Sequence, residues 1–141
     1  MIVDRKKFQK FWKLPWNLPE IVFCNEKYYI PSLEEIEINI IPLYNDFIKR
    51  YNIGRNNSWN CSKFSQTFKL VCDIYYKEKN CDAHFAISIA HIELKKSQYD
   101  HALNLIFYKK DDNIDYIFFE PESNQLYKDN TKFKNIKFLY F

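Results

Sequence analysis

Cys61 is the residue of this sequence best placed to act as a nucleophile. It lies in "SWNCSKFSQTFKLVCDIYY", residues 58–76, at the start of a predicted helix. A helix N-terminus lowers the pKa of a cysteine through the helix macrodipole and the unpaired backbone N–H groups. The resulting thiolate can attack an acyl carbon when an imidazole beside it serves first as base and then as acid.

His101 is the histidine best placed to be that base, because it opens a predicted strand in "HALNLIFYKK". A carboxylate that accepts from the other ring nitrogen would orient the imidazole. We take Lys109 and Ile114 as the last pair before the turn of the next hairpin. Glu122 then faces His101 directly, and Glu120 lies on the diagonal, roughly 7–8 Å away and within reach of a long side chain. This count leaves both glutamates open.

The helix that carries Cys61 is predicted over about residues 60–77. Its apolar residues recur at spacings of three, four and seven, which is the pattern of one buried helical face. Ser58 or Asn60 can cap its first turn. The buried face is formed by Cys61, Phe64, Phe68, Val71, Cys72 and Tyr75.

A second helical region is predicted upstream. Ser32 and Glu35 form a capping box at its start, Pro42 interrupts it, and Gly54 ends it. Residues 1–27 are rich in Trp, Phe and Pro and are predicted to be irregular. From about residue 84 onward the apolar period changes from 3.6 to 2, which indicates strands. The predicted fold class is therefore α+β, with N-terminal helices packed on a C-terminal antiparallel sheet.

The composition predicts a single packed domain over residues 1–141. Apolar residues make up 47% of the chain, and the net charge of +3 is scattered, so we expect no nucleic-acid partner. We expect no membrane span, and the N-terminus lacks the apolar core of a secretory signal, so the predicted location is cytoplasmic. With one glycine in the chain, tight turns must use Asn and Asp.

The four cysteines are read first as small buried hydrophobic residues, since this is their commonest role. No pair has CxxC spacing, and the three histidines do not repeat at the spacing of metal ligands. We therefore predict no metal and no cofactor. In a reducing cytosol we also expect no disulfides. The four positions are Cys24, Cys61, Cys72 and Cys81.

A set of short motifs in a fixed order carries a family resemblance over residues 28–127. The order is "YYIPSLEEIE", "WNCSKFSQTF", "AHFAISIAHIE", "DHALNLIF" and "YIFFEPESNQLY". It resembles papain-like cysteine-protease domains related to the C-terminal domain of a fungal galactose-binding agglutinin, a family that includes small phage proteins. The resemblance implies a papain-like fold with Cys61 as nucleophile, His101 as base and Glu120 as orienting acid.

Several positions depart from this family or compete with it. Asn60, Ser62 and Lys63 surround the cysteine, where the family usually has acidic residues. Cys81 in "CDAHFA" imitates the cysteine motif, but the pattern after it suits a strand, so we prefer Cys61. The oxyanion glutamine of papain-like enzymes has no match here. Asn56 or Asn57 could take the place of this glutamine and stabilise the oxyanion. Cys81 and Glu122 remain alternative members of the triad.

Two functions of different classes follow. The first is a small cysteine peptidase, or a related thiol hydrolase, acting on a protein or peptide substrate through a Cys-His-Glu triad. The alternative is a non-catalytic, phage-encoded binding protein on the same fold that inhibits a host or defence protein. A binding protein needs no thiolate, so the reactivity of Cys61 separates the two.

Overall fold

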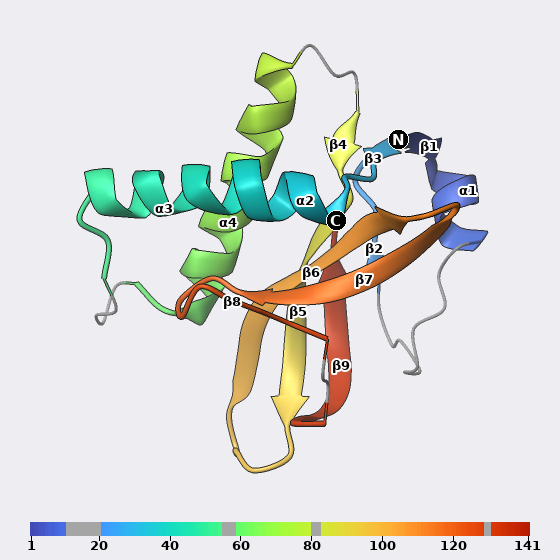
Figure 1. The fold of residues 1–141 in the computed structure, drawn as a ribbon. Helices are drawn as coiled ribbons and strands as arrows, with labels where there is room; N and C mark the ends of the chain where they lie inside the picture. The colour runs from blue at the N-terminus through green and yellow to red at the C-terminus, as the bar shows by residue number, and fades with distance from the viewer. Residues whose placement is uncertain (11–20, 55–58, 80–82, 129–130) are drawn as a thin grey trace.

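The chain folds around a six-stranded sheet with its main helices on one face (Figure 1). The structure is a computed structural model that describes residues 1–10, 21–54, 59–79, 83–128 and 131–141. The elements in chain order are β1 (Ile2–Asp4), α1 (Arg5–Lys10), β2 (Ile21–Val22), β3 (Lys27–Tyr29), α2 (Leu33–Glu35), η1 (Ile36–Ile40), α3 (Ile41–Arg50), α4 (Cys61–Glu78), β4 (His84–Phe85), β5 (Ile87–Leu94), β6 (Asp100–Lys110), β7 (Asn113–Glu120), β8 (Gln125–Tyr127) and β9 (Phe133–Tyr140).

The six-stranded sheet has the order β2-β9-β5-β6-β7-β8. Its neighbours are antiparallel except for β2 and β9, which are parallel. A smaller sheet joins β1, β3 and β4. The fold is thus a mixed α and β fold, mostly strands with a few helices, and the predicted antiparallel sheet is confirmed apart from the β2–β9 pair.

The pleat of β6 separates two hydrophobic cores, because successive side chains of a strand point to opposite faces. Leu103, Leu105 and Phe107 face the core that also contains Phe8 of α1. Ile106 and Tyr108 belong to the other core, which the helices cover. The central strand is therefore buried on both sides and provides a rigid support for residues at its start.

Helix α4 lies against the sheet through the apolar face that its spacing predicts. Phe68 and Cys72 are fully buried, and the Phe68 ring lies 4.3 Å, centroid to centroid, from the ring of Phe119 on β7. Asn60 caps the helix, since its Oδ1 accepts from the N–H of Lys63 at 3.3 Å. Cap and buried face together place Cys61 at the first helical position, as predicted.

The upstream helical region differs from the prediction in its interior. Ser32 caps α2 as expected, with its Oγ accepting from the N–H of Glu35 at 3.0 Å. Pro42 does not interrupt the run, because it occupies the first turn of α3, where a missing N–H costs nothing. The irregularity lies just before it, as the π-helical segment η1. The helix ends at Arg50, before the predicted stop at Gly54.

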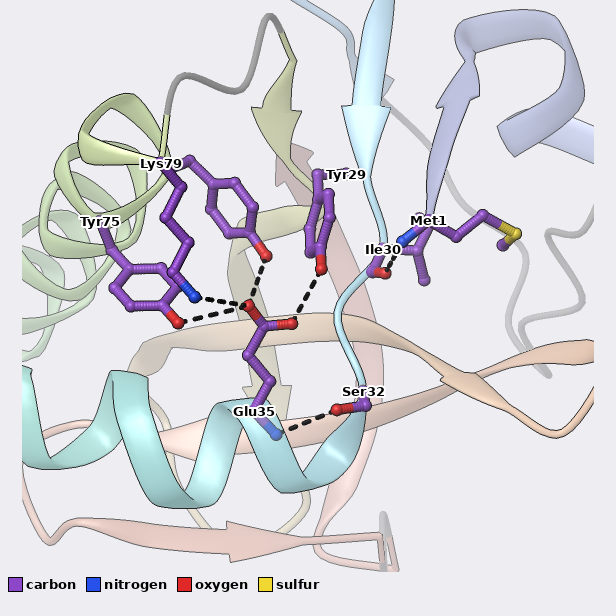
Figure 2. A network of polar contacts seen from close by, with 8 residues as sticks. Met1, Tyr29, Ile30, Ser32, Glu35, Tyr75 and Lys79 are labelled. Atoms are coloured by element: carbon purple, nitrogen blue, oxygen red, sulfur yellow. Dashed lines mark hydrogen bonds and ion pairs between the residues drawn. The ribbon is translucent and has the colours of Figure 1, made fainter.

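Glu35 does not complete the capping box and instead joins α2 to the far end of α4 (Figure 2). Its carboxylate accepts from the hydroxyls of Tyr29 at 2.9 Å, Tyr76 at 3.1 Å and Tyr75 at 3.3 Å. The ammonium of Lys79 lies 3.8 Å away. The three hydroxyls and the ammonium fix the C-terminal half of α4 against β3 and α2.

Further predictions from the sequence can be compared with the described residues. The first 27 residues are not irregular where the structure describes them, since they contain β1, α1 and β2. Left-handed backbone falls on Asn52, Asp111 and Asn124, so the prediction that Asn and Asp form the tight turns is confirmed. The sequence also predicts a turn at Asp129 and Asn130, which lie outside the described residues. No helix in the described part of the chain combines the length and apolar character needed to cross a membrane.

Candidate functional site

The Cys61 thiol lies at the start of α4, half-buried against the start of β6. Its pKa is lowered, and the largest cause is a hydrogen bond with the His101 ring. The backbone N–H groups of Ala102 and Ser62 also donate to the sulfur and lower the pKa further. Burial opposes these effects, but three donors outweigh it. The site therefore favours the thiolate form of Cys61.

The His101 imidazole lies between the thiol and the carboxylate of Glu120. Its Nε2 contacts Glu120 Oε2, and the side chain of His101 is 25% exposed. The pKa of His101 is raised to about 10, first by the hydrogen bond with Cys61 and then by the one with Glu120. The imidazolium is thus favoured well above neutral pH, and it faces a thiol whose pKa is lowered, an arrangement that favours a charged Cys–His pair.

Glu120 ends β7 on the same face of the sheet as His101. The β6–β7 register pairs Lys109 with Ile114 as predicted. Continued along the ladder, this register puts Glu120 diagonal to His101. Glu122 does not provide the contacting carboxylate; its N–H donates to Glu120 Oε1 at 3.4 Å. Glu120 therefore accepts at both oxygens, which fixes its orientation toward the ring.

The segment after Glu120 is held by α3. The hydroxyl of Tyr44 donates to the carbonyl of Pro121 at 3.1 Å, although the two residues are 77 positions apart. Tyr44 is buried, and burial together with the charges of Glu120 and Glu122 raises the pKa of its hydroxyl. The neutral phenol thus remains a donor and anchors the end of β7.

Other predicted site residues are not part of this cluster, or lie outside the described residues. The residues that lie outside the described part of the chain are Asn56, Asn57 and Cys81. Cys72 is fully buried in the core, where burial raises the pKa of its thiol. Cys24 is exposed, so the expectation that it is buried is wrong. In the described part of the chain, no group of three or more His, Cys, Asp or Glu side chains could hold a metal ion.

Sequence reasoning missed the backbone donors of the site. The N–H of Ala102 points to the thiol from the residue after His101, and no side-chain pattern could indicate it. It also missed Asn104, a fully buried amide on β6 that contacts α4. The signal for Asn104 was available, since a polar residue inside the apolar run "ALNLIF" is unusual in a strand buried on both faces.

Comparison with known proteins gives a likeness of fold. No protein-family model matches the chain, and no curated protein sequence matches it either. The chain is similar to PSL1a in a PSL1a-E64 complex, with a TM-score of 0.71 and 14% identity over 99% of this chain and 50% of that one. It is also similar to Polyporus squamosus lectin bound to the human-type influenza-binding epitope Neu5Aca2-6Galb1-4GlcNAc, with a TM-score of 0.66 and 17% identity over 86% of this chain and 42% of that one.

The chain thus spans about half the length of the structures that it matches. The predicted relation to a fungal agglutinin is confirmed at the level of fold. The prediction of a cysteine peptidase or related hydrolase is wrong: it relied on a fold ascribed to peptidases, and the solved structures that share the fold are of lectins.

Proposed function

We propose that this chain is a binding protein that captures ligands carrying an electrophilic carbon, through the thiolate of Cys61 and without turnover. Binding without turnover is the class of function that the likeness to lectins supports, whereas inhibition of a host or defence protein finds no support in it. The observation that carries the proposal is the placement of Cys61 at the first position of α4 beside a His101 ring that Glu120 orients, with the thiol pKa lowered there. A second support is that PSL1a, which shares this fold, forms a complex with E64.

The capture step balances with the groups of the site. The Cys61 sulfur forms a bond to an epoxide carbon, and the carbon–oxygen bond of the ring breaks. The released alkoxide takes the proton of the His101 imidazolium. The products are a stable thioether, an alcohol and a neutral imidazole, whose ring Glu120 keeps oriented. One ligand is bound per chain.

The test is alkylation by iodoacetamide at pH 6, followed by peptide mapping. An ordinary thiol of pKa about 8.5 is roughly 0.3% thiolate at this pH. A thiolate of lower pKa is also less nucleophilic, which offsets part of the gain, so we expect Cys61 to react on the order of 10 to 100 times faster than an ordinary thiol. Exposed Cys24 is the internal reference. E64 should add its mass once, and Cys61→Ser should abolish the addition.

Two control variants sharpen this test. His101→Asn keeps the thiol but removes its strongest partner, so the pH 6 rate should fall toward that of Cys24. Cys24→Ser should leave the Cys61 rate unchanged. Equal rates for Cys61 and Cys24 in the parent protein would overturn the proposal, and repeated turnover of a ligand would contradict capture.

Carbohydrate binding is a second candidate, favoured by a groove between α4, β5 and β9. The groove has a volume of about 460 Å³ and combines the rings of Phe138 and Tyr140 with polar side chains, including Lys69 and Asp73. Asp73 Oδ1 is buried without a hydrogen-bond partner among the described residues, and a sugar hydroxyl can donate to such an oxygen. Sugars bind by stacking a ring face on an aromatic side chain and bonding their hydroxyls to polar groups around it.

A titration separates this candidate from the first. The trisaccharide Neu5Aca2-6Galb1-4GlcNAc, which the Polyporus squamosus lectin binds, is added to ¹⁵N-labelled protein. Binding in the groove predicts shifts confined to α4, β5 and β9 that disappear in Asp73→Asn and Tyr140→Ala. Tyr99→Ala is the control, because Tyr99 is 72% exposed and does not line the groove. No shifts at millimolar sugar would rule the groove out as a site for this ligand.

The domain organisation and the cellular location of the chain are proposals as well. We propose a single papain-like domain over residues 1–141, supported by a helix that begins with cysteine and packs on a strand that begins beside a histidine. A cytoplasmic location is supported by the needs of a reduced, reactive thiol.

A further inference from the structure

Asn104 makes an unusual pair of contacts in the middle of the protein. It lies on β6, three residues after His101, and is fully buried. Its Nδ2 donates to the carbonyl of Ser65 at 3.0 Å and to the carbonyl of Ser88 at 3.3 Å. Both partners can only accept, so the NH₂ end of the amide must face them, and the side chain has one permitted orientation.

The two carbonyls belong to different elements that both adjoin the thiol site. Ser65 lies on α4 one helical turn after Cys61, and Ser88 lies on β5, the neighbour of β6. One amide therefore joins the helix that carries the thiol to the strand that carries the imidazole. The link is about 6 Å along the helix from Cys61, since four residues rise about 1.5 Å each.

A polar side chain at position 104 needs a physical reason, because the position is buried between apolar neighbours. Ala102 and Ile106, the nearest residues of β6 on the same face, are buried and apolar, so a leucine would fill the space of Asn104 without loss of solvation. Asn104 Oδ1 and the hydroxyls of Ser65 and Ser88 are also buried, with no hydrogen-bond partner among the described residues. A buried polar cluster of this kind costs stability and is justified where it specifies one geometry.

We propose that Asn104 is a positioning residue that holds the start of α4 in register with β6, so that the Cys61 thiol stays in hydrogen-bond contact with the His101 ring. The inference rests on the proposed function of Cys61. A hydrophobic contact between α4 and the sheet tolerates small slides of the helix, whereas the hydrogen bond to Ser65, from an amide that also binds Ser88, does not. The thiol needs this precision because its contacts with the ring and with the N–H of Ala102 are directional.

The test measures the pH dependence of Cys61 alkylation by iodoacetamide in Asn104→Leu, beside a melting curve. We expect the midpoint to move up toward that of an ordinary thiol and the rate at pH 6 to fall by about tenfold or more. Ile106→Val is the matched control: Ile106 lies on the same strand and face, is equally buried, and has an apolar side chain that donates no hydrogen bond. It should lower stability and leave the midpoint in place.

The outcomes distinguish this inference from the proposed function. A parent protein whose Cys61 reacts like Cys24 would overturn both. A reactive parent with the same midpoint in folded Asn104→Leu would overturn the positioning role alone. If Asn104→Leu does not fold, Asn104→Ala replaces it, because alanine leaves both carbonyls without a donor and has a smaller side chain than leucine. An unchanged midpoint in that variant would likewise overturn the inference.

Discussion

Replacing Glu120 by glutamine is the most informative single change at this site. Glutamine has nearly the same size and can still accept a hydrogen bond from the His101 ring, so the fold should persist. What it removes is the negative charge beside Nε2. The imidazolium then loses one of its two stabilising partners and the thiolate remains the other. The charged pair should therefore form less readily, and the pKa of the Cys61 thiol should rise.

The expected size of this effect follows from the pKa of His101. The rise from 6.5 to about 10 corresponds to about 5 kcal/mol, at about 1.4 kcal/mol for each tenfold change. The hydrogen bond and the charge of Glu120 provide part of this rise, and we take their share as about 2 kcal/mol. This agrees with the roughly 1.5–3 kcal/mol of hydrogen bonds to charged groups. Glu120→Gln should shift the balance between the charged and neutral pairs by about 30-fold.

The assay is the rate of Cys61 alkylation by iodoacetamide from pH 4 to 10, resolved by peptide mapping. The acid-side midpoint should rise by more than one pH unit in Glu120→Gln, with a melting temperature close to that of the parent. Glu122→Gln is the matched control, because the hydrogen bond from Glu122 to Glu120 comes from its backbone N–H, which the substitution keeps. The same midpoint in Glu120→Gln and in the parent would show that the carboxylate does not set the charge state of the pair.

Three further predictions concern stability. Phe68→Ala should cost about 3–5 kcal/mol in chemical denaturation, because the ring is fully buried against those of Tyr44 and Phe119. Glu35→Ala should cost about 1–3 kcal/mol by the same measurement, since it leaves Tyr76 and other hydroxyls without their acceptor, whereas exposed Glu37→Ala should be near neutral. The His101 pKa is raised on folding, so its contribution to stability is complete below about pH 6.5 and is lost as pH rises through about 10. Melting temperatures of His101→Asn should therefore show a smaller alkaline fall than those of the parent.

The parts of the fold that the sequence predicted are those with local signals. Helix α4 follows from an apolar spacing and from Asn60, a residue whose side chain can cap. The β6–β7 register follows from the short turn between the strands, since one correct pair near a turn fixes every other pair. Glu120 could be placed near His101 for this reason, before any tertiary contact was known.

The parts that could not be predicted depend on contacts between distant segments. The parallel pairing of β2 with β9 joins Ile21 to Leu139, and no short pattern encodes such a partner. The role of Glu35 was mistaken because its capping box is local, whereas its real partners Tyr75 and Tyr76 lie 40 and 41 positions away. The predicted function was wrong for a related reason: a resemblance of short motifs was taken to imply a shared reaction.

The distribution of donors around Cys61 explains why the fold alone cannot decide the function. Two of the groups that lower the thiol pKa are the backbone N–H groups of Ser62 and Ala102, which any sequence with this helix and strand would present. The third and strongest is the side chain of His101, which a single substitution removes. A chain with the same fold and a different residue at that position would keep the pocket for the sulfur but lose the imidazolium. Binding and thiol reactivity can therefore separate on this scaffold while the backbone stays the same, and His101 is where they separate.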